Sequence, residues 1–159
     1  PETVRDDSAR AAGACAPTSV TMMLRRIGIN ADASEVARRA FDPNARIFGN
    51  WAFLVAAASE YGADAWVQRF ASLDELHETL SAGAPVIASV SYKKGDLSVK
   101  PDRASAGHLL VVRGADADGN FICNDPDFTD PARGDGCVIN RLEFARAWFS
   151  HGAVALMVT

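Results

Sequence analysis

Three residue types that together can form a nucleophilic catalytic site occur at informative places in this chain. Cys15 stands immediately before the helix predicted for residues 17–27, in the segment Ala14-Cys15-Ala16-Pro17. The positive end of a helix dipole and free backbone N–H groups lower the pKa of a thiol at such a position. A cysteine placed there is therefore a candidate nucleophile.

His108 and Asp125 can meet across a predicted hairpin. A tight turn at residues 116–119 would set Leu110 opposite Asp125, so that His108 and Asp125 become diagonal neighbours on one sheet face. Their backbones would be roughly 7–8 Å apart, a gap that an imidazole and a carboxylate can close to a hydrogen bond. The sequence thus predicts a His–Asp dyad, which Cys15 would complete as a Cys–His–Asp triad.

Each of these residues also has a plain structural interpretation. A lone cysteine before a helix is commonly a small buried apolar residue, a lone histidine a hydrogen-bonding core residue, and an aspartate before proline a turn residue. The occurrence of all three, with the hairpin geometry, favours the functional interpretation.

The remaining candidates have weaker signals. Cys123 and Cys137 fall in predicted strands; we expect buried free thiols, with a disulfide as the alternative, and the odd count of three cysteines leaves at least one thiol unpaired. His77 and His151 are predicted surface residues. The segment Asp116–Asn120 is predicted to be a hairpin turn, because its glycine is misplaced for a calcium-binding loop.

The elements that must position the triad divide the chain into two halves. Apolar spacing and capping residues predict helices over 17–27, from 32, over 50–62 and from 72. The second half is read as strands at 85–91, 109–112, 121–123, 137–139 and 153–158, with long polar loops at 93–106 and 125–136 and one helix at 142–149. A further strand is predicted at 65–70, between the helix at 50–62 and the helix that begins at 72. Helices followed by antiparallel strands indicate an α+β fold.

Length and composition limit the class of protein. The 159 residues suit a single domain over 1–159, and 48% hydrophobic and 23% charged residues are typical of globular proteins. With a net charge of −4 and arginines scattered among acids, no basic face for nucleic acid is visible. The apolar runs fall far short of the ~20 residues of a membrane span. The chain begins at Pro1 without Met or signal peptide, so we expect a fragment or mature form that lacks upstream residues; the oligomeric state is left open.

The quoted segments resemble the C39-like, papain-fold cysteine peptidases. Residues 15–19 (CAPTS) resemble the family's Cys-Gly-Pro-Thr-Ser opening, residues 107–112 (GHLLVV) its His strand, and residues 124–126 (NDP) its Asn-Asp-Pro segment. Residues 49–51 and 84–90 also resemble secreted bacterial members. The resemblance spans about residue 15 to the C-terminus and implies a papain-like fold.

The resemblance implies thiol-dependent hydrolysis of a peptide or amide bond. Cys15 would be the nucleophile, His108 the general base and then acid, and Asp125 the orienting residue, with a peptide or protein as substrate and no metal or organic cofactor. An extracellular location is favoured. Two other functions stay open: acyl transfer by the same triad, and a degenerate domain that only binds a peptide or protein.

Substrate contacts and the oxyanion hole are less well defined by the sequence. Asn50 and Trp51 are expected either to line the cleft or to act as helix cap and core aromatic, and Asn124 is a further candidate for substrate binding. Papain-like enzymes place a Gln before the Cys, but the single Gln here, Gln68, falls in a predicted strand. The backbone N–H of Cys15 is one expected donor, and the second would come from Ser8, Arg10 or a group before Pro1.

Overall fold

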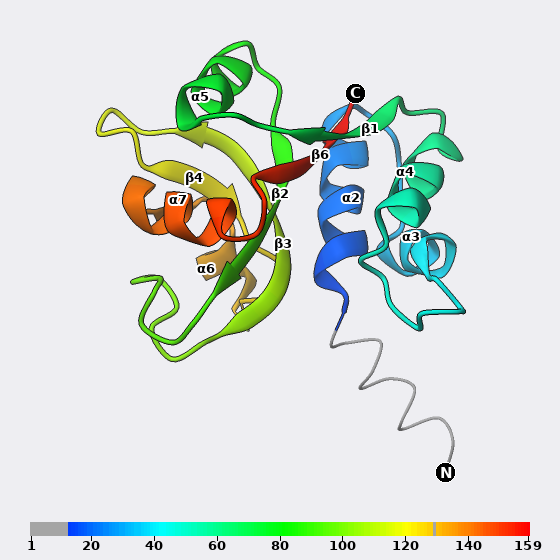
Figure 1. The fold of residues 1–159 in the computed structure, drawn as a ribbon. Helices are drawn as coiled ribbons and strands as arrows, with labels where there is room; N and C mark the ends of the chain where they lie inside the picture. Colours follow the sequence, from blue (N-terminus) through cyan, green and yellow to red (C-terminus); the bar gives the residue numbers. More distant parts are fainter. Residues whose placement is uncertain (1–12, 129) are drawn as a thin grey trace.

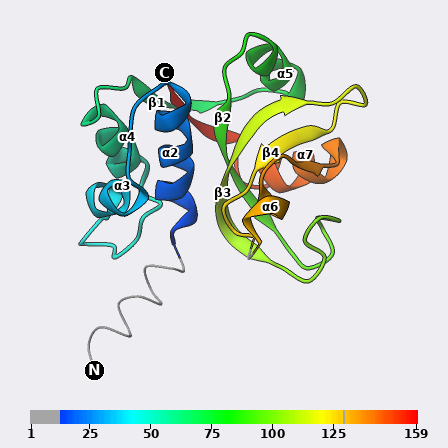
Figure 2. The ribbon, with the colours of Figure 1, turned by 180° about the vertical axis from the view of Figure 1, so that it is seen from behind.

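A computed structural model describes residues 13–128 and 130–159 of the chain, which form one six-stranded sheet with helices on both faces (Figure 1). The strand order is β1-β6-β2-β3-β4-β5, and every neighbouring pair is antiparallel. Helices α2, α3 and α4 gather on one side of the sheet, and α5 and α7 lie on the other, as the two opposite views agree (Figure 2). The α+β fold expected from the sequence is confirmed.

The elements follow the predicted pattern closely. The helices are α2 (Cys15–Arg26), α3 (Ala33–Ala40), α4 (Trp51–Ser59), α5 (Leu73–Ser81), α6 (Pro131–Gly134) and α7 (Arg141–Phe149). The strands are β1 (Ala65–Arg69), β2 (Val86–Tyr92), β3 (Ser105–Ala115), β4 (Phe121–Asn124), β5 (Cys137–Ile139) and β6 (Val154–Val158). None of the helices in the described part of the chain is long and apolar enough to cross a membrane.

Alternating strand residues build two separate hydrophobic cores, one on each face of the sheet. On β3, Leu109 and Val111 pack with α2, α3 and α4, whereas Leu110 and Val112 pack with α5 and α7. This period of two is the side-chain alternation of a strand buried on both faces. The central strands therefore hold α2 in a fixed position against β3, where the candidate site lies.

The hairpin between β3 and β4 has the predicted register next to the site. Val111 pairs with Asn124 and Val112 with Cys123, and the register shifts by one residue only nearer the turn. The turn places Gly119 at φ 78°, a conformation that suits glycine. The carboxylate of Asp116 accepts hydrogen bonds from the N–H groups of Asp118 and Asn120, which confirms a hairpin turn.

Three details differ from the sequence prediction. Helix α2 begins at Cys15 rather than Pro17, so that the thiol lies within the first turn and not before it. Strand β3 begins four residues earlier than expected, at Ser105. The loop after β4 contains the short helix α6, capped by Asp130, which apolar periodicity could not reveal in four residues.

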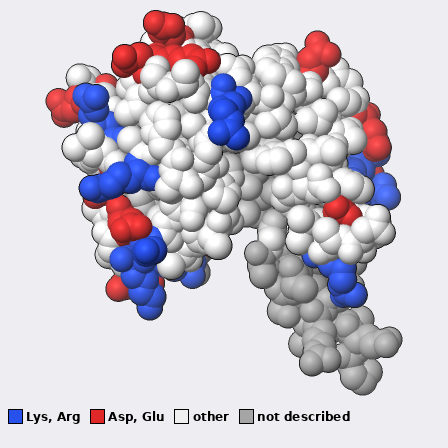
Figure 3. Space-filling model, viewed as in Figure 1, with Lys and Arg blue, Asp and Glu red and all other residues white. Residues whose placement is uncertain are grey.

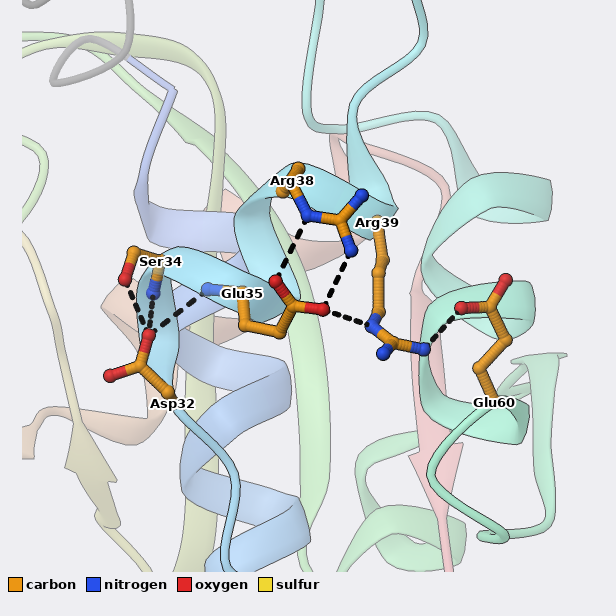
Figure 4. Close-up of polar contacts among 6 residues, drawn as sticks. All are labelled: Asp32, Ser34, Glu35, Arg38, Arg39 and Glu60. Atoms are coloured by element: carbon orange, nitrogen blue, oxygen red, sulfur yellow. Dashed lines mark hydrogen bonds and ion pairs between the residues drawn. The ribbon is translucent and has the colours of Figure 1, made fainter.

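A network of exposed charges joins α3 to α4 (Figure 4). Asp32 caps α3 by accepting from the N–H groups of Ser34 and Glu35, as the capping box predicted. The Glu35 carboxylate accepts hydrogen bonds from Arg38 and Arg39. Arg39 also forms an ion pair with Glu60, the residue that follows α4. On the face shown in Figure 3, Lys and Arg side chains are interspersed with Asp and Glu around the rim.

Candidate active site

The start of α2 differs from the other helix starts in the described residues because no side chain caps it. Ala14 occupies the N-cap position, has no side-chain cap hydrogen bond, and is followed by no acidic residue in the first turn. Thr18 N–H bonds the Ala14 carbonyl oxygen, and Pro17 has no N–H. The N–H groups of Cys15 and Ala16 therefore remain at the positive end of the helix, directly beside the thiol.

The half-buried Cys15 thiol lies near the imidazole of His108. Burial alone would raise the pKa of the thiol, but the interaction with the His108 imidazolium outweighs it. The backbone groups of Leu109 and Ala16 act in the same direction. The net result is a pKa below the ordinary value of 9.0, so the arrangement favours a thiolate.

His108 and Asp125 form the hydrogen bond that the hairpin register predicted. Nε2 of His108 lies 2.8 Å from Oδ1 of Asp125, and both side chains are almost fully buried. Because Nε2 is engaged with the carboxylate, Nδ1 is the ring nitrogen left to face Cys15. Burial opposes a charged imidazole, but the hydrogen bonds to Asp125 and Cys15 prevail and raise the pKa of His108 to about 9.

The Asp125 carboxylate is held at both oxygens. Oδ1 also accepts from the N–H of Asp127 at 2.9 Å, and Oδ2 lies 2.7 Å from the Nζ of Lys100. Burial raises the pKa of this carboxyl, but His108 first and Lys100 second lower it to about 2. Asp125 is therefore ionised and oriented toward His108.

The backbone of Asp125 is fixed by the close approach of α6. Its N–H donates to the carbonyl oxygen of Gly134 at 2.9 Å. A Cβ on Gly134 would lie 2.3 Å from the Asp125 carbonyl oxygen, so only glycine allows this contact without a shift. Gly134 is thus a positioning element of the site that the sequence analysis assigned to an undifferentiated loop.

Lys100 is the other residue that the sequence analysis missed. It lies in the segment predicted to be a polar loop, yet its side chain is only 3% exposed. One signal was available, since a loop of 14 residues between two strands is long enough to fold back over the sheet. Nothing in the sequence indicates which of its three lysines would turn inward.

The candidate substrate-binding residues have structural roles in the fold. Asn50 caps α4 by accepting from Ala52 N–H, and its amide donates to the buried carboxylate of Asp42 at 2.6 Å. Trp51 packs partly buried against the core beside α2. The helix-cap and core-aromatic interpretation therefore describes both residues, and a role in binding substrate stays a prediction.

Asn124 lies on the α2 side of the sheet, away from the His108–Asp125 hydrogen bond. Its side-chain oxygen accepts from the N–H of Gly136 at 3.1 Å. Asn124 also lines a cavity of about 370 Å³ together with Met22, Met23 and Arg26 of α2. Its contact with a substrate likewise stays a prediction.

The other candidates are placed away from the dyad or have no partner in it. All three cysteines are free thiols, although Cys123 and Cys137 are directly opposed on β4 and β5.

Gln68 lies on the edge strand β1, where its amide donates to Glu75, so it is not the oxyanion donor. Ser8 and Arg10 lie outside the described residues. His77 stacks on Phe121 rather than standing free, and His151 is exposed.

Within residues 13–128 and 130–159, no group of three or more His, Cys, Asp or Glu side chains is arranged to hold a metal ion.

Comparison with solved structures shows the same fold in three bacterial peptidase structures. A Bacillus anthracis protein described as a C39-like peptidase superposes with a TM-score of 0.66 at 20% identity, over 91% of this chain and 88% of that one. The peptidase domain of Streptococcus ComA, a bifunctional ABC transporter of a quorum-sensing pathway, gives 0.66 at 17% identity, over 91% and 90%. A double-glycine-motif protease from an AMS/PCAT transporter, solved with its leader peptide, gives 0.60 at 20% identity, over 91% and 82%.

The comparison of sequences gives the family directly. No curated protein matches the chain. The profile of the Peptidase_C39 like family matches residues 4–155, which is nearly the whole sequence. The protein therefore belongs to the Peptidase_C39 like family of cysteine peptidases.

Proposed function

We propose that this protein hydrolyses a peptide bond by nucleophilic catalysis, with Cys15 as the nucleophile, His108 as the general acid and base, and Asp125 as the orienting residue. The proposal rests mainly on the buried His108–Asp125 pair, joined at 2.8 Å, whose imidazole lowers the pKa of the nearby Cys15 thiol at the start of α2. The activity is assigned to a single domain over the whole chain. A leader peptide bound to a protein of similar fold supports a peptide as the substrate class.

The reaction follows from the charges of the site. The Cys15 thiolate attacks the carbonyl carbon of the substrate and forms a tetrahedral oxyanion. The His108 imidazolium then donates its proton to the leaving amine, the C–N bond breaks, and a thioester on Cys15 remains. Neutral His108 next removes a proton from water, the resulting hydroxide attacks the thioester carbon, and the C–S bond breaks to release the carboxylic acid and restore the Cys15 thiolate and His108 imidazolium.

The backbone at the start of α2 supplies an oxyanion donor. The N–H of Cys15 points from the positive end of the helix, where developing negative charge is stabilised. The N–H of Ala16 already contributes to the low pKa of the Cys15 thiol. Loss of one oxyanion donor typically lowers the rate ~10²–10³-fold, so the Cys15 N–H should contribute strongly to the rate of peptide hydrolysis.

Selective alkylation of the three thiols tests the nucleophile without knowledge of the substrate. We expect iodoacetamide at pH 7 to modify Cys15 first, as measured by mass spectrometry of tryptic peptides. Burial raises the pKa of Cys123 well above the ordinary value and that of Cys137 to about 11, so both should react slowly. The variant His108→Ala should lose the fast modification at Cys15, and equal slow labelling of all three thiols would contradict the proposal.

A peptide library with mass-spectrometric detection tests the reaction itself. Wild-type protein should produce new peptide termini, and Cys15→Ser should produce none. Adding glycinamide separates hydrolysis from acyl transfer, since a transferase would yield amide-capped products in place of free acids. Fast labelling of Cys15 without any cleavage or transfer would leave a peptide-binding domain as the function.

A further inference from the structure

Lys100 is a buried cation whose ammonium group is paired with two carboxylates. Its Nζ lies 2.7 Å from Oδ2 of Asp125 and 3.2 Å from Oδ2 of Asp127. The phenol of Tyr92 lies close enough for the two groups to affect each other's pKa. Burial of an ammonium is costly unless it is paired in this way, so the fold holds Lys100 at a defined place.

The remaining surroundings of Lys100 fix it further. The ring of Phe128 lies beneath the ammonium, with Nζ 4.8 Å from the ring centre, and Arg133 approaches the same ring at 5.4 Å. The rings of Tyr92 and His108 are nearly perpendicular, with their centroids 6.4 Å apart. Lys100 therefore contacts the Asp125 carboxylate, the direct partner of His108, and no contact with the reacting sulfur is seen in the described residues.

We propose that Lys100 is a positioning residue that locks the Asp125 carboxylate in place and makes the His108 imidazolium a better proton donor to the leaving amine. This inference rests on the proposed function of the triad. Lys100 shares the carboxylate with His108, because the two cations bind different oxygens of one group. A second cation on the carboxylate weakens its hold on the imidazolium proton, which must be released when the C–N bond breaks.

Other ionisable groups face this network and must be kept unchanged in a test. Apart from Lys100 itself, they come from α2, β2, β4, β5 and the loops beside the site: Cys15, Tyr92, Arg103, Cys123, Asp127 and Cys137. None of these is altered by the substitution Lys100→Met, which keeps the length and apolar stem of the side chain.

Replacing Lys100 by an uncharged residue should raise the pKa of the neighbouring ionisable groups. Removing a buried positive charge raises the pKa of every ionisable group near it, so both limbs of the pH profile of kcat/KM should move to higher pH by about one unit in Lys100→Met. Looser positioning of Asp125 should also lower kcat by about tenfold to a hundredfold. The matched control is Lys93→Met, an exposed lysine of the same loop, which should leave profile and rate unchanged.

An NMR titration keeps this inference separate from the proposed function. In the catalytically blocked Cys15→Ala protein, the His108 ring signals report the imidazole pKa whether or not the wild-type protein is a peptidase. Adding Lys100→Met should raise that pKa, and an unchanged pKa in a folded variant would overturn the inference. If the pKa rises but wild-type protein cleaves nothing, the proposed function fails while the coupling of Lys100 to His108 stands.

A double variant guards against misfolding of Lys100→Met, which leaves a buried carboxylate with one partner fewer. Lys100→Met combined with Asp125→Asn removes both charges of the pair. If Lys100 acts through Asp125, the double variant should have the kcat/KM of Asp125→Asn within about twofold. If kcat/KM of the double variant is instead about tenfold lower than that of Asp125→Asn, the two effects are independent. Lys100 then has a separate structural role, and the inference is overturned.

Discussion

Two networks of charged side chains in this protein contain a carboxylate with a pKa of about 2, and they reach it by opposite routes. Glu35 on α3 is partly exposed to solvent, and hydrogen bonds from Arg38 and then Arg39 lower its pKa against only a small effect of burial (Figure 4). Asp125 is 4% exposed, and burial works against its charge, so His108 and Lys100 must supply more than the burial penalty. Ionisation of Glu35 therefore costs little free energy, whereas ionisation of Asp125 must overcome the cost of burying a charge.

The comparison indicates where function lies. Water screens the α3 network, so its ion pairs contribute little and their loss is easily tolerated. The Asp125 network excludes water, so each partner depends on the others, and removal of one leaves an uncompensated buried group. Buried ionised groups beside a thiol and an uncapped helix start make the Asp125 network the candidate for catalysis that we propose, whereas the Glu35 network ties α3 to α4.

The largest expected effect comes from Asp125→Asn, which keeps the shape of the side chain but removes its charge. The imidazolium loses its main stabilising partner, so kcat/KM should fall by about two to four orders of magnitude. The pKa of His108 should fall from about 9 toward 6.5. Steady-state kinetics over pH 5–10 would measure both changes, and an unaltered alkaline limb would show that Asp125 does not support His108.

The next effect concerns the backbone that carries Asp125. Gly134→Ala introduces a Cβ that would lie 2.3 Å from the Asp125 carbonyl oxygen, so α6 or Asp125 must shift. Because small displacements of catalytic groups are costly, kcat/KM should fall by about tenfold to a hundredfold. Gly114→Ala is the matched control, since a Cβ there meets nothing within 4 Å. Equal rates in the two variants would contradict the positioning role of Gly134.

The ionisation of His108 should make both activity and stability of the unmodified protein depend on pH. The raised pKa of His108 means that the folded state favours its imidazolium, a stabilisation present below pH 6.5 and lost as pH rises through about 9. Activity and thermal stability should therefore decline together as the pH rises through about 9, as measured by kcat/KM and the melting temperature. An alkaline limb near 6.5 would mean that burial prevails over the hydrogen bonds to Asp125 and Cys15.

The smallest effect is expected in the exposed network. Glu35→Gln removes the charge that joins Arg38 and Arg39, but the site lies on other elements and the ion pairs face solvent. We expect unchanged kcat/KM and a small decrease in melting temperature that shrinks further in ~1 M salt, where such pairs are screened. A loss of activity comparable with that of Asp125→Asn would remove the distinction between the two networks.

The local features of this protein could be predicted from its amino-acid sequence. Capping residues such as Asp32 and Ser72 placed helix starts, and short continuous apolar runs placed the central strands, because both signals depend on neighbours in the chain. The turn predicted at residues 116–119 implied the register that pairs Val111 with Asn124, and this register brings His108 to Asp125. The structure reaches it through a one-residue register shift between Val112 and Gly114, which the sequence did not predict. The boundaries were less accurate: α2 begins two residues earlier than predicted and β3 four residues earlier, and the short helix α6 was not predicted.

The tertiary structure decided what meets the dyad from distant parts of the chain. Lys100 is in a polar loop like Lys93 and Lys94, and only packing against Phe128, Tyr92 and Asp125 buries it. Gly134 matters because α6 folds back onto the Asp125 backbone, a contact that no periodicity records. The proximity of Cys15 to His108 likewise depends on how α2 packs against β3. Such long-range contacts follow from the joint packing of both cores, whereas caps and registers follow from a few neighbouring residues.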